Sequence, residues 1–435
     1  GVAAQIRSLG FNAIRLPFSV EAIRSSSISS VNTSLGRNSE LAGKTPLEAM
    51  DLIVAEARRQ DLLVLLDLHS LEDDSFSRPL WYGNGYSEGD WVDAWRTMAT
   101  RYGDDPNVIG ADLKNEPHGE AQWGTGTAED WRRAAERAGD AIHAIAPHWL
   151  AVVEGVEGPV AGQQLPSHWW GGNLEGVRSA PVRLARANKL VYSPHEYGPG
   201  VFNQPWFSDP NFQEVLYDRW QKGFDFIAQD RTAPILVGEF GGRQTGTDTV
   251  EGIWQRQLID FIGRRGHSWT YWSWNPNSSD TGGILGDDWQ TPVPEKLALL
   301  QKLQRREPIE FPGAAPWPPG SDVGGGTGGG SAGGGGSTDP GGGSATGDGD
   351  GQSGESVAPD TRITGGPPER SRRRRVRFQF ESDLAGSFEC RLDDGDWGDC
   401  ASPARLRVAP GRHRFRVRAS DRGALAPTPA IHSFR

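Results

Sequence analysis

Short apolar runs alternate with longer amphipathic stretches over the first 312 residues, and this alternation limits the fold more than any other feature of the chain. Short apolar runs bounded by turns are typical of buried strands, whereas the longer stretches have the apolar spacing of helices. Seven such runs occur, at 11–16, 62–68, 108–113, 150–153, 190–193, 235–238 and 269–274. Strands that alternate with helices in this way form a parallel α/β sheet.

The residues at the ends of these runs distinguish between two parallel architectures. Seven strands fit either a doubly wound sheet or a (β/α)8 barrel with one strand missing. In a barrel the carboxyl ends of all strands meet at one face, so groups at those ends would converge. No Gly-x-Gly-x-x-Gly motif follows the first run, which weakens the dinucleotide-binding alternative. We therefore predict a TIM barrel over residues 1–312, because six of the runs end in chemically capable groups: Arg15, His69, Asn115–Glu116, His195–Tyr197, Glu239 and Trp272.

The composition changes after residue 312. Residues 313–359 are rich in Pro and Gly, and 18 of the 35 residues from 320 to 354 are Gly, which predicts a flexible linker. Residues 360–435 alternate apolar and polar side chains, as in 375–380 and 412–418, and predict a small all-β sandwich domain. Cys390 and Cys400 flank a turn with the spacing of a hairpin, so we expect a disulfide and an oxidising, extracellular compartment.

Charge and composition exclude several classes of protein. The net charge of −11 argues against nucleic-acid binding by the chain as a whole, and no apolar stretch is long enough for membrane insertion. Two cysteines are too few for a thiolate zinc site, and neither a His-Glu-x-x-His motif nor an acidic calcium loop occurs. We therefore expect no metal and no cofactor. Fifteen of the 17 Trp residues lie within residues 1–312, where flat apolar surfaces would suit pyranose rings.

Two glutamates follow buried runs about 120 residues apart in the sequence. Glu116 lies in an Asn-Glu-Pro string, and Glu239 lies in a Gly-Glu-Phe-Gly string. Glycoside hydrolysis with retention needs two carboxyl groups about 5–5.5 Å apart, one as nucleophile and one as acid/base. Glu116 alone fits a helix-start carboxylate better than a catalytic role, and Glu239 alone fits a buried ion-pair partner equally well. Their expected position on one face of the barrel favours a catalytic pair.

Several longer strings carry a resemblance to a known family. They lie at 10–19 (GFNAIRLPFS), 115–117 (NEP), 169–174 (WWGGNL), 191–197 (VYSPHEY), 238–241 (GEFG), 271–276 (YWSWNP) and 280–285 (DTGGIL). On these strings, residues 1–300 resemble glycoside hydrolase family 5, specifically its bacterial endo-β-1,4-glucanases, or cellulases. The resemblance implies retaining hydrolysis of internal β-1,4 bonds of a β-glucan such as cellulose by two glutamates.

The resemblance also implies a role for each matched position. Glu116 would be the acid/base and Glu239 the nucleophile. The remaining positions would bind substrate or support the nucleophile: Arg15 beneath it, His69 in the −1 subsite, Asn115 on the sugar 2-hydroxyl, His195 beside the site, Tyr197 on the nucleophile's carboxylate and Trp272 as a stacking platform. Among the Trp residues in loop-like segments, we expect Trp170 to bind sugar. Three of these positions also have a purely structural interpretation. Arg15 fits an ordinary buried ion pair, His69 fits a hydrogen-bonded histidine at a strand end, and Tyr197 fits a half-buried loop aromatic.

The family's barrel has eight strands, and the helix at 2–9 matches its first helix, so the predicted barrel lacks its first strand. Two alternatives to the cellulase function stay open. One keeps the mechanism but acts on mannan, xyloglucan or β-1,3-glucan, because loops rather than the strand-end motifs set the choice of polymer. The other is a carbohydrate-binding fragment without turnover.

The tail resembles the immunoglobulin-like repeats of secreted bacterial proteins, on the strings at 388–393 and 411–421. From residue 369 onward it contains 15 Arg and 9 acidic residues, a net charge of +6. This balance motivates a hypothesis of weak electrostatic association with an anionic cell wall. We expect a secreted monomer whose main partner is its polysaccharide substrate.

Overall fold

The computed structural model of the chain describes residues 1–28, 31–34, 36–73, 77–305, 307, 361–367, 374–382, 387–393, 395, 397–411, 413–421, 424–425 and 429–434. The chain divides into two compact units, Gly1–Ala315 and Pro316–Arg435. The linker predicted at 313–359 lies outside the described residues. No helix within the described ranges is long and apolar enough to cross a membrane.

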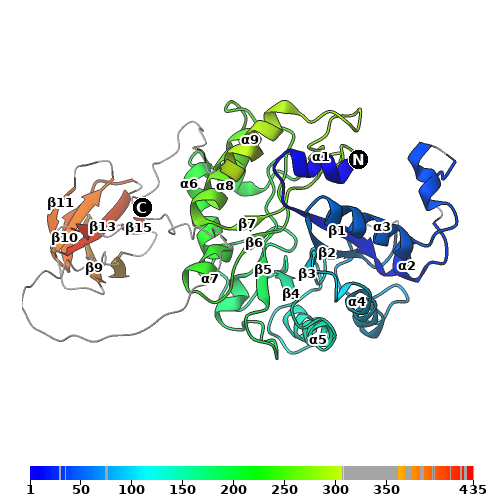
Figure 1. Cartoon of the computed structure of the whole chain (residues 1–435). Coiled ribbons are helices and arrows are strands. Elements are labelled where there is room, and N and C mark those ends of the chain that lie inside the picture. The colour runs from blue at the N-terminus through cyan, green and yellow to red at the C-terminus, as the bar shows by residue number, and fades with distance from the viewer. Residues whose placement is uncertain are drawn as a thin grey trace, which may run out of the picture. The chain divides into compact units, whose positions relative to one another are not determined.

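Parallel strands form the centre of unit 1 (Figure 1). Its described residues contain seven: β1 (Ala13–Ser19), β2 (Leu63–Ser70), β3 (Val108–Asp112), β4 (Leu150–Glu154), β5 (Leu190–Ser193), β6 (Leu236–Val237) and β7 (Ser268–Trp269). The first five pair in chain order, and β6 pairs with β7. Parallel bridges from Tyr192 to Ile235 and from His195 to Glu239 continue the order from β5 to β6. The six strand ends that carry candidate chemistry therefore lie along one continuous order of parallel strands.

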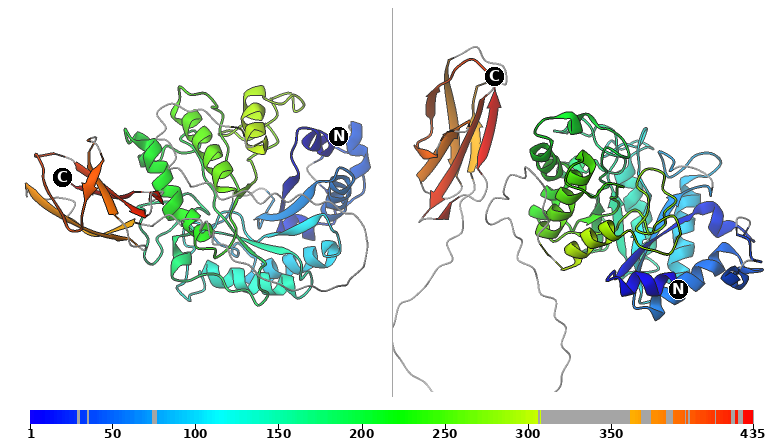
Figure 2. Two further views of the ribbon diagram at one scale, coloured as in Figure 1. Left: turned by 60° about the vertical axis from the view of Figure 1, so that its left-hand side comes forward. Right: turned by 90° about the horizontal axis from the view of Figure 1, so that it is seen from above.

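Helices cover the outside of these strands (Figures 1 and 2). They are α1 (Val2–Ser8), α2 (Val20–Arg24), α3 (Pro46–Arg59), α4 (Glu88–Tyr102), α5 (Trp131–His143), α6 (Phe212–Trp220), α7 (Phe226–Gln229), α8 (Val250–Arg265) and α9 (Pro294–Arg305), with short helices η1 (Gly36–Leu41), η2 (Glu175–Arg178), η3 (Pro205–Ser208) and η4 (Gln221–Asp225). Capping boxes begin α3 and α4, where Thr45 pairs with Glu48 and Ser87 pairs with Asp90.

The predicted α/β barrel fold is confirmed, but one strand is much shorter than predicted. The seventh run was expected at 269–274, whereas β7 ends at Trp269. The chain keeps two further ladder contacts, from Thr270 N–H to the Val237 carbonyl and from Trp272 N–H to the Phe240 carbonyl. The opposing segment after Val237 is irregular and rich in Gly, so these contacts do not extend into a regular strand.

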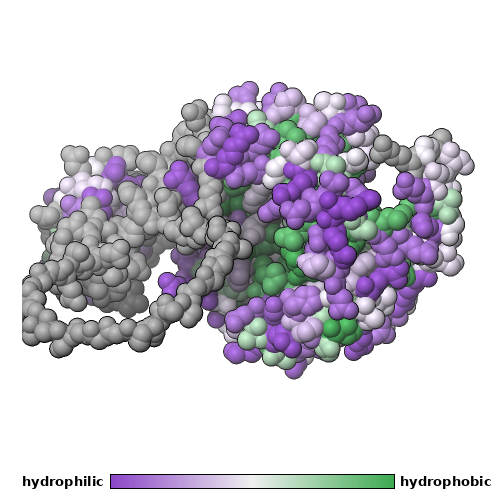
Figure 3. All heavy atoms as spheres, viewed as in Figure 1, coloured by the Kyte–Doolittle hydropathy of each residue, from purple (hydrophilic) through white to green (hydrophobic). Residues whose placement is uncertain are grey.

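Tryptophans fill much of the space between strands and helices in unit 1. Trp81, Trp91, Trp95 and Trp131 are fully buried, and the Trp81 ring lies 5.3 Å from that of Trp131. Many of the aromatic residues counted in the sequence are therefore core rather than surface. Figure 3 shows that hydrophobic residues also line a hollow in the viewed face of unit 1, with hydrophilic residues around it.

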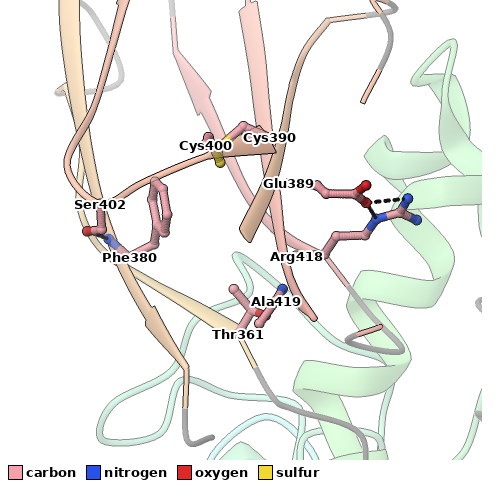
Figure 4. Close-up of a disulfide and its surroundings, with 8 residues drawn as sticks. All are labelled: Thr361, Phe380, Glu389, Cys390, Cys400, Ser402, Arg418 and Ala419. Carbon is pink, nitrogen blue, oxygen red and sulfur yellow. Dashed lines mark hydrogen bonds and ion pairs between the residues drawn. A yellow bond between two sulfur atoms is a disulfide. The ribbon is translucent and has the colours of Figure 1, made fainter. Parts of the chain in front are cut away.

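Unit 2 is a sandwich of two antiparallel sheets. One sheet has the order β12 (Ala404–Arg407), β9 (Arg375–Ser382), β8 (Thr361–Gly365). The other contains β11 (Gly398–Cys400), β10 (Ser387–Leu392) and β13 (His413–Asp421), with β14 (Ala424–Leu425) and β15 (Ala430–Phe434) paired to β13. Phe378 of the first sheet stacks on Phe415 of the second, with ring centroids 3.9 Å apart. The predicted disulfide joins Cys390 to Cys400 between β10 and β11 (Figure 4).

Candidate active site

The ends of the parallel strands of unit 1 bring a set of charged and aromatic side chains together. Arg15 comes from β1, His69 from β2, Asn115 and Glu116 follow β3, and Glu239 follows β6. Most residues of these strands are apolar and many are buried, and their charged side chains are few: Arg15 in β1, Asp67 and His69 in β2, and Asp112 at the end of β3. The structure places every predicted site residue except Trp170 in direct contact with another member of the predicted set.

Glu239 is almost completely buried, and its carboxylate accepts short hydrogen bonds from two side chains. Nη1 of Arg15 donates to its Oε1 at 2.6 Å, and the hydroxyl of Tyr197 donates to its Oε2 at 2.6 Å. Burial by itself raises the pKa of Glu239, but the charges of His195 and Arg15 outweigh burial and lower that pKa below its ordinary value. Glu239 is therefore held as a carboxylate, the form that attacks as a nucleophile.

Arg15 connects the strand ends through a single guanidinium. Its Nε lies 2.8 Å from Asp112, its Nη1 lies 3.0 Å from Asp67, and its Nη2 lies 2.9 Å from Oδ1 of Asn115. Its side chain is 5% exposed, so these contacts are shielded from water. Burial alone lowers the pKa of Arg15, but the carboxylates of Asp67 and Asp112 outweigh it and raise that pKa. A permanent positive charge thus lies against the Glu239 carboxylate.

Glu116 projects from a turn directly after Asn115, and its backbone has a left-handed conformation with φ of 51°. Its side chain is 17% exposed, more than that of Glu239. Potential ligand atoms of Glu116, His195 and Glu239 all lie within 4.8 Å of one another. The two carboxyl groups are therefore close enough for a nucleophile and an acid/base to act on one glycosidic bond.

His195 lies between the two glutamates and is fully buried. Its Nδ1 is 3.0 Å from Oε1 of Glu116 and 3.7 Å from Oε2 of Glu239. Its Nε2 is 3.2 Å from Oε1 of Glu154. Burial opposes the charged imidazolium, but Glu154 and Glu239 outweigh it and raise the pKa of His195 well above its ordinary value. His195 therefore carries a positive charge between the carboxylates.

His69 and Trp272 form an aromatic pair near Glu239. Their rings stack with centroids 5.2 Å apart and planes 9° apart. Nδ1 of His69 lies 2.7 Å from Asp67, which fixes the orientation of the imidazole. Both side chains are only partly buried, so faces of the pair remain accessible to a flat ligand.

Trp170 is connected to Glu116 through His118. Its ring stacks on His118, with centroids 3.7 Å apart and planes 4° apart, and Nδ1 of His118 lies 2.7 Å from the Glu116 carbonyl oxygen. Trp170 is half-buried. His118 thus links this exposed aromatic surface to the backbone of Glu116. Sequence analysis singled out Trp170 but not His118.

Four buried charged residues of the site carried no sequence motif and were not predicted: Asp67, Asp112, Lys114 and Glu154. Nζ of Lys114 hydrogen-bonds the Ser77 hydroxyl at 2.9 Å and also the Asn115 carbonyl, and burial lowers its pKa to about 8. Burial raises the pKa of Asp112 well above its ordinary value, although Arg15 offsets part of this effect. The only signal in the sequence was a charged residue inside or at the end of a buried run.

Two sets of side chains have ligand atoms close enough to surround a metal ion, Asp67–His69–Glu239 and Glu116–His195–Glu239. Both sets include Glu239, whose Oε1 already contacts the Arg15 guanidinium. A cation there would face the positive charges of Arg15 and His195 at short range, which is unfavourable in a buried site. The arrangement favours acid–base and nucleophilic chemistry by carboxyl groups.

Comparison with known proteins agrees with this geometry. The family model described as Cellulase (glycosyl hydrolase family 5) matches residues 1–278. The chain belongs to glycosyl hydrolase family 5. It is therefore a glycoside hydrolase, and all of the clustered strand-end residues from Arg15 to Trp272 lie within the matched range.

Individual relatives match a similar share of the chain. An endoglucanase of Paenibacillus polymyxa is 45% identical over 302 residues, which are 69% of this chain and 75% of that protein. The major extracellular endoglucanase of Xanthomonas campestris pv. campestris is 42% identical over 302 residues, 69% of this chain and 61% of that protein. The family 5 match therefore accounts for unit 1, and this chain spans less than two thirds of the Xanthomonas protein.

Solved structures support the family fold. A hyperthermophilic endocellulase of Pyrococcus horikoshii has a TM-score of 0.65 at 41% identity, covering 70% of this chain and 85% of that one. The catalytic domain of the major endoglucanase of Xanthomonas campestris pv. campestris has a TM-score of 0.65 at 41% identity, covering 70% and 90%.

Proposed function

We propose that this family 5 enzyme is a retaining endo-β-1,4-glucanase in which Glu239 is the nucleophile and Glu116 the acid/base. The observation that carries the proposal is the placement of their carboxyl oxygens within 4.8 Å of each other, with only Glu239 held by both Arg15 and Tyr197. Retaining enzymes need closely spaced carboxyl groups in different environments. Glu239 is the ionised member, and Glu116 is the more exposed member.

The reaction proceeds in two displacements. A Glu239 carboxylate oxygen forms a bond to the anomeric carbon while the bond from that carbon to the leaving oxygen breaks, and the Glu116 proton moves to the leaving oxygen. In the second step Glu116 accepts a proton from water, the water oxygen bonds to the anomeric carbon, and the ester to Glu239 breaks. Net retention follows because each step inverts the anomeric carbon.

The surrounding side chains supply substrate contacts. The stacked His69–Trp272 pair offers an aromatic face beside Glu239, and Trp170 offers a second face beyond Glu116. Pyranose C–H faces stack on such rings. The Asn115 amide oxygen accepts from Arg15, and its amide nitrogen lies 3.5 Å from Nε2 of His69. This fixes the orientation of the amide, whose nitrogen donates to the 2-hydroxyl of the −1 sugar in the proposed complex. Sugar units therefore bind on both sides of the cleaved bond, as an endo-acting enzyme requires.

The β-1,4-glucan substrate is supported by the relatives. The Paenibacillus and Xanthomonas proteins are endoglucanases, and the Pyrococcus horikoshii endocellulase has been solved in complex with cellotetraose. The Xanthomonas relative is extracellular, and the Cys390–Cys400 disulfide of unit 2 is typical of an oxidising compartment. We therefore propose a secreted enzyme that acts on cellulose-type polymers as a monomer.

Release of reducing ends from a panel of soluble polymers tests this function. The panel contains a β-1,4-glucan, mannan, xyloglucan and a β-1,3-glucan, and the chain is assayed beside Glu116→Gln and Glu239→Gln. We expect activity on the β-1,4-glucan and its loss in both variants. Higher activity on another polymer would contradict the proposed β-1,4-glucan substrate. No activity on any polymer would favour a carbohydrate-binding role.

Unit 2 has a separate feature that supports association with an anionic cell-wall polymer. Strand register places Arg405 of β12 opposite Arg377 of β9, and Arg407 opposite Arg375. The side chains of Arg374, Arg377, Arg405 and Arg407 are exposed, and they make no hydrogen bond or ion pair with another described residue. Like charges directly opposite each other are destabilising, and a carboxylated polysaccharide would relieve their repulsion.

Cosedimentation of the full chain with insoluble polygalacturonate at increasing salt tests this association. We expect weak binding that falls with salt and is lost when Arg377, Arg405 and Arg407 are replaced together by Gln. The matched control replaces three exposed arginines of unit 1 (Arg133, Arg183 and Arg186) by Gln, which removes the same charge. Binding that does not change with salt concentration would contradict the role of the arginines on β9 and β12. An equal loss of binding in both triple variants would contradict it as well.

A further inference from the structure

Glu154 is a fully buried carboxylate at the end of β4 that no motif identified. Its two carboxyl oxygens lie against the backbone of Glu116 and the ring of His195. We propose that Glu154 is a positioning residue for the acid/base, acting through these two contacts. The proposal rests on the assignment of Glu116 as the acid/base.

The first contact holds the backbone of Glu116. Oε2 of Glu154 accepts a hydrogen bond of 2.8 Å from the Glu116 N–H. Glu116 has a φ of 51°, a left-handed backbone conformation that residues other than Gly and Asn rarely adopt. Such a conformation persists only where surrounding contacts impose it. A carboxyl oxygen that accepts from the N–H is a contact of this kind, and it fixes the direction in which the Glu116 side chain leaves the backbone.

The neighbouring backbone leaves room for this carboxylate. A Cβ added at Gly171 would lie 2.3 Å from Oε2 of Glu154 and 3.3 Å from the Cα of Glu116. Gly171 has a φ of 66°, and its carbonyl accepts from Gly155 N–H at 2.8 Å, one residue beyond Glu154. The loop at Gly171 thus packs directly over the hydrogen bond between Glu154 and Glu116, and only a residue without a side chain fits there.

The second contact sets the charge of the imidazole that faces Glu116. Oε1 of Glu154 lies 3.2 Å from Nε2 of His195, and Nδ1 of the same ring lies 3.0 Å from Glu116. Arg15 lies 3.3 Å from the same Oε1, and Lys114, Asp112 and Glu239 are the other charged groups around the cluster. Burial raises the pKa of Glu154, although His195 and Arg15 offset part of that rise. The short distance between Oε1 and Nε2 raises the pKa of His195, which favours the ring form whose Nδ1 donates toward the Glu116 carboxyl group.

These contacts matter for the chemistry because Glu116 must deliver a proton along one direction. A leaving group of high pKa needs that proton, whereas a leaving group of low pKa departs as a stable anion without it. A fault in the position of Glu116 therefore slows the first class of substrate selectively. A general loss of packing would slow both classes alike.

Kinetics with two aryl β-cellobiosides test this prediction on the full chain. Glu154→Gln keeps the size and shape of the side chain but removes its charge. With phenyl β-cellobioside, whose leaving group has the higher pKa, we expect kcat/KM to fall roughly 10- to 100-fold, the loss typical of one charge-assisted hydrogen bond. With 2,4-dinitrophenyl β-cellobioside we expect kcat/KM to change less than about threefold. Equal losses on the two substrates, or no loss on either, would overturn the proposal.

Two further variants separate this inference from the proposed function. Glu116→Gln must show the same selective loss, and if it does not, the assignment of Glu116 fails rather than that of Glu154. Asp112→Asn is the matched control, because Asp112 is also a buried acidic residue that contacts Arg15. Among the described side chains it makes no hydrogen bond or ion pair with Glu116 or His195. We expect it to lower both rates equally. If Glu154→Gln does not fold, Gly171→Ala displaces the same carboxylate and must give the selective loss, and an equal loss there would overturn the proposal.

Discussion

The Tyr197 hydroxyl donates a hydrogen bond of 2.6 Å to Oε2 of Glu239, opposite the oxygen that contacts Arg15. Each oxygen of this buried carboxylate thus has its own donor. The arrangement divides the support of the nucleophile between a neutral group and a permanent cation, and the two contributions are separable by substitution.

Replacement of Tyr197 by Phe removes the neutral donor and keeps the ring. Because this hydrogen bond favours the ionised carboxylate, its loss raises the pKa of Glu239. The acidic limb of the profile of kcat/KM against pH is then expected to move to higher pH, and kcat/KM at the optimum to fall roughly 10- to 100-fold. An unchanged acidic limb would show that Tyr197 does not set the ionisation of the nucleophile. Trp269→Phe, which changes an aromatic residue of β7 outside the site, serves as the control.

Replacement of Arg15 by Met acts mainly on stability. It leaves the buried carboxylates of Asp67, Asp112 and Glu239 without their shared cation, and breaking a buried ion pair costs about 3–5 kcal/mol. We expect the free energy of unfolding, measured by urea denaturation at pH 7, to fall by about that amount. The loss shrinks at acid pH, where the orphaned carboxylates take up protons in the folded state.

The exposed Arg96 provides a matched control for this change. Its guanidinium pairs with Asp93 on the surface of α4, and both side chains are more than half exposed. Surface pairs of this type contribute little, so Arg96→Met is expected to change stability by less than about 0.5 kcal/mol. Similar losses for the two variants would contradict the role given to the buried network.

Much of this site was predictable because a barrel brings strand ends together. Six strand ends with chemically capable groups were enough to predict a common face, and Arg15, His69, Glu116 and Glu239 do meet there. Glu154 could not be predicted in the same way. It ends an ordinary apolar run, and only its burial distinguishes it from a charged residue at the start of a surface loop.

Aromatic residues show a second limit of the sequence. Trp81, Trp123 and Trp206 lie in segments that look like loops, yet all three are buried, whereas Trp170 is accessible. A tryptophan in a long loop has the same local signature whether the loop folds back on the core or forms a wall of the site. Its contacts depend on tertiary packing, which local periodicity does not encode.

The buried Glu196 predicts a pH dependence of stability. Burial raises its pKa to about 7, although Arg219 nearby opposes the shift. A carboxyl group whose pKa is raised in the folded state contributes stability that is complete below its unfolded pKa and is lost as the pH rises toward 7. We expect Glu196→Gln to unfold at the same urea concentration as the unmodified chain at pH 4. At pH 8 it should be more stable, by about 3 kcal/mol.

The same measurement on Glu295→Gln controls for the loss of a charge, because Glu295 is exposed on α9. That variant should shift the urea midpoint of unfolding only slightly, and by the same amount at both pH values. If Glu196→Gln increased the free energy of unfolding as much at pH 4 as at pH 8, packing rather than ionisation of Glu196 would explain the effect.

The Cys390–Cys400 disulfide closes a short loop in a unit with a small core. Constraint of such a loop in the unfolded chain contributes about 2–3 kcal/mol to stability. We expect replacement of both cysteines by Ser to increase amide hydrogen exchange across β10, β11 and β13, measured by mass spectrometry on the full chain. Peptides from β2 and β3 of unit 1 are the internal reference and should exchange as before. Protection of β10 and β13 that persisted without the disulfide would show that the Phe378–Phe415 core stabilises unit 2 by itself.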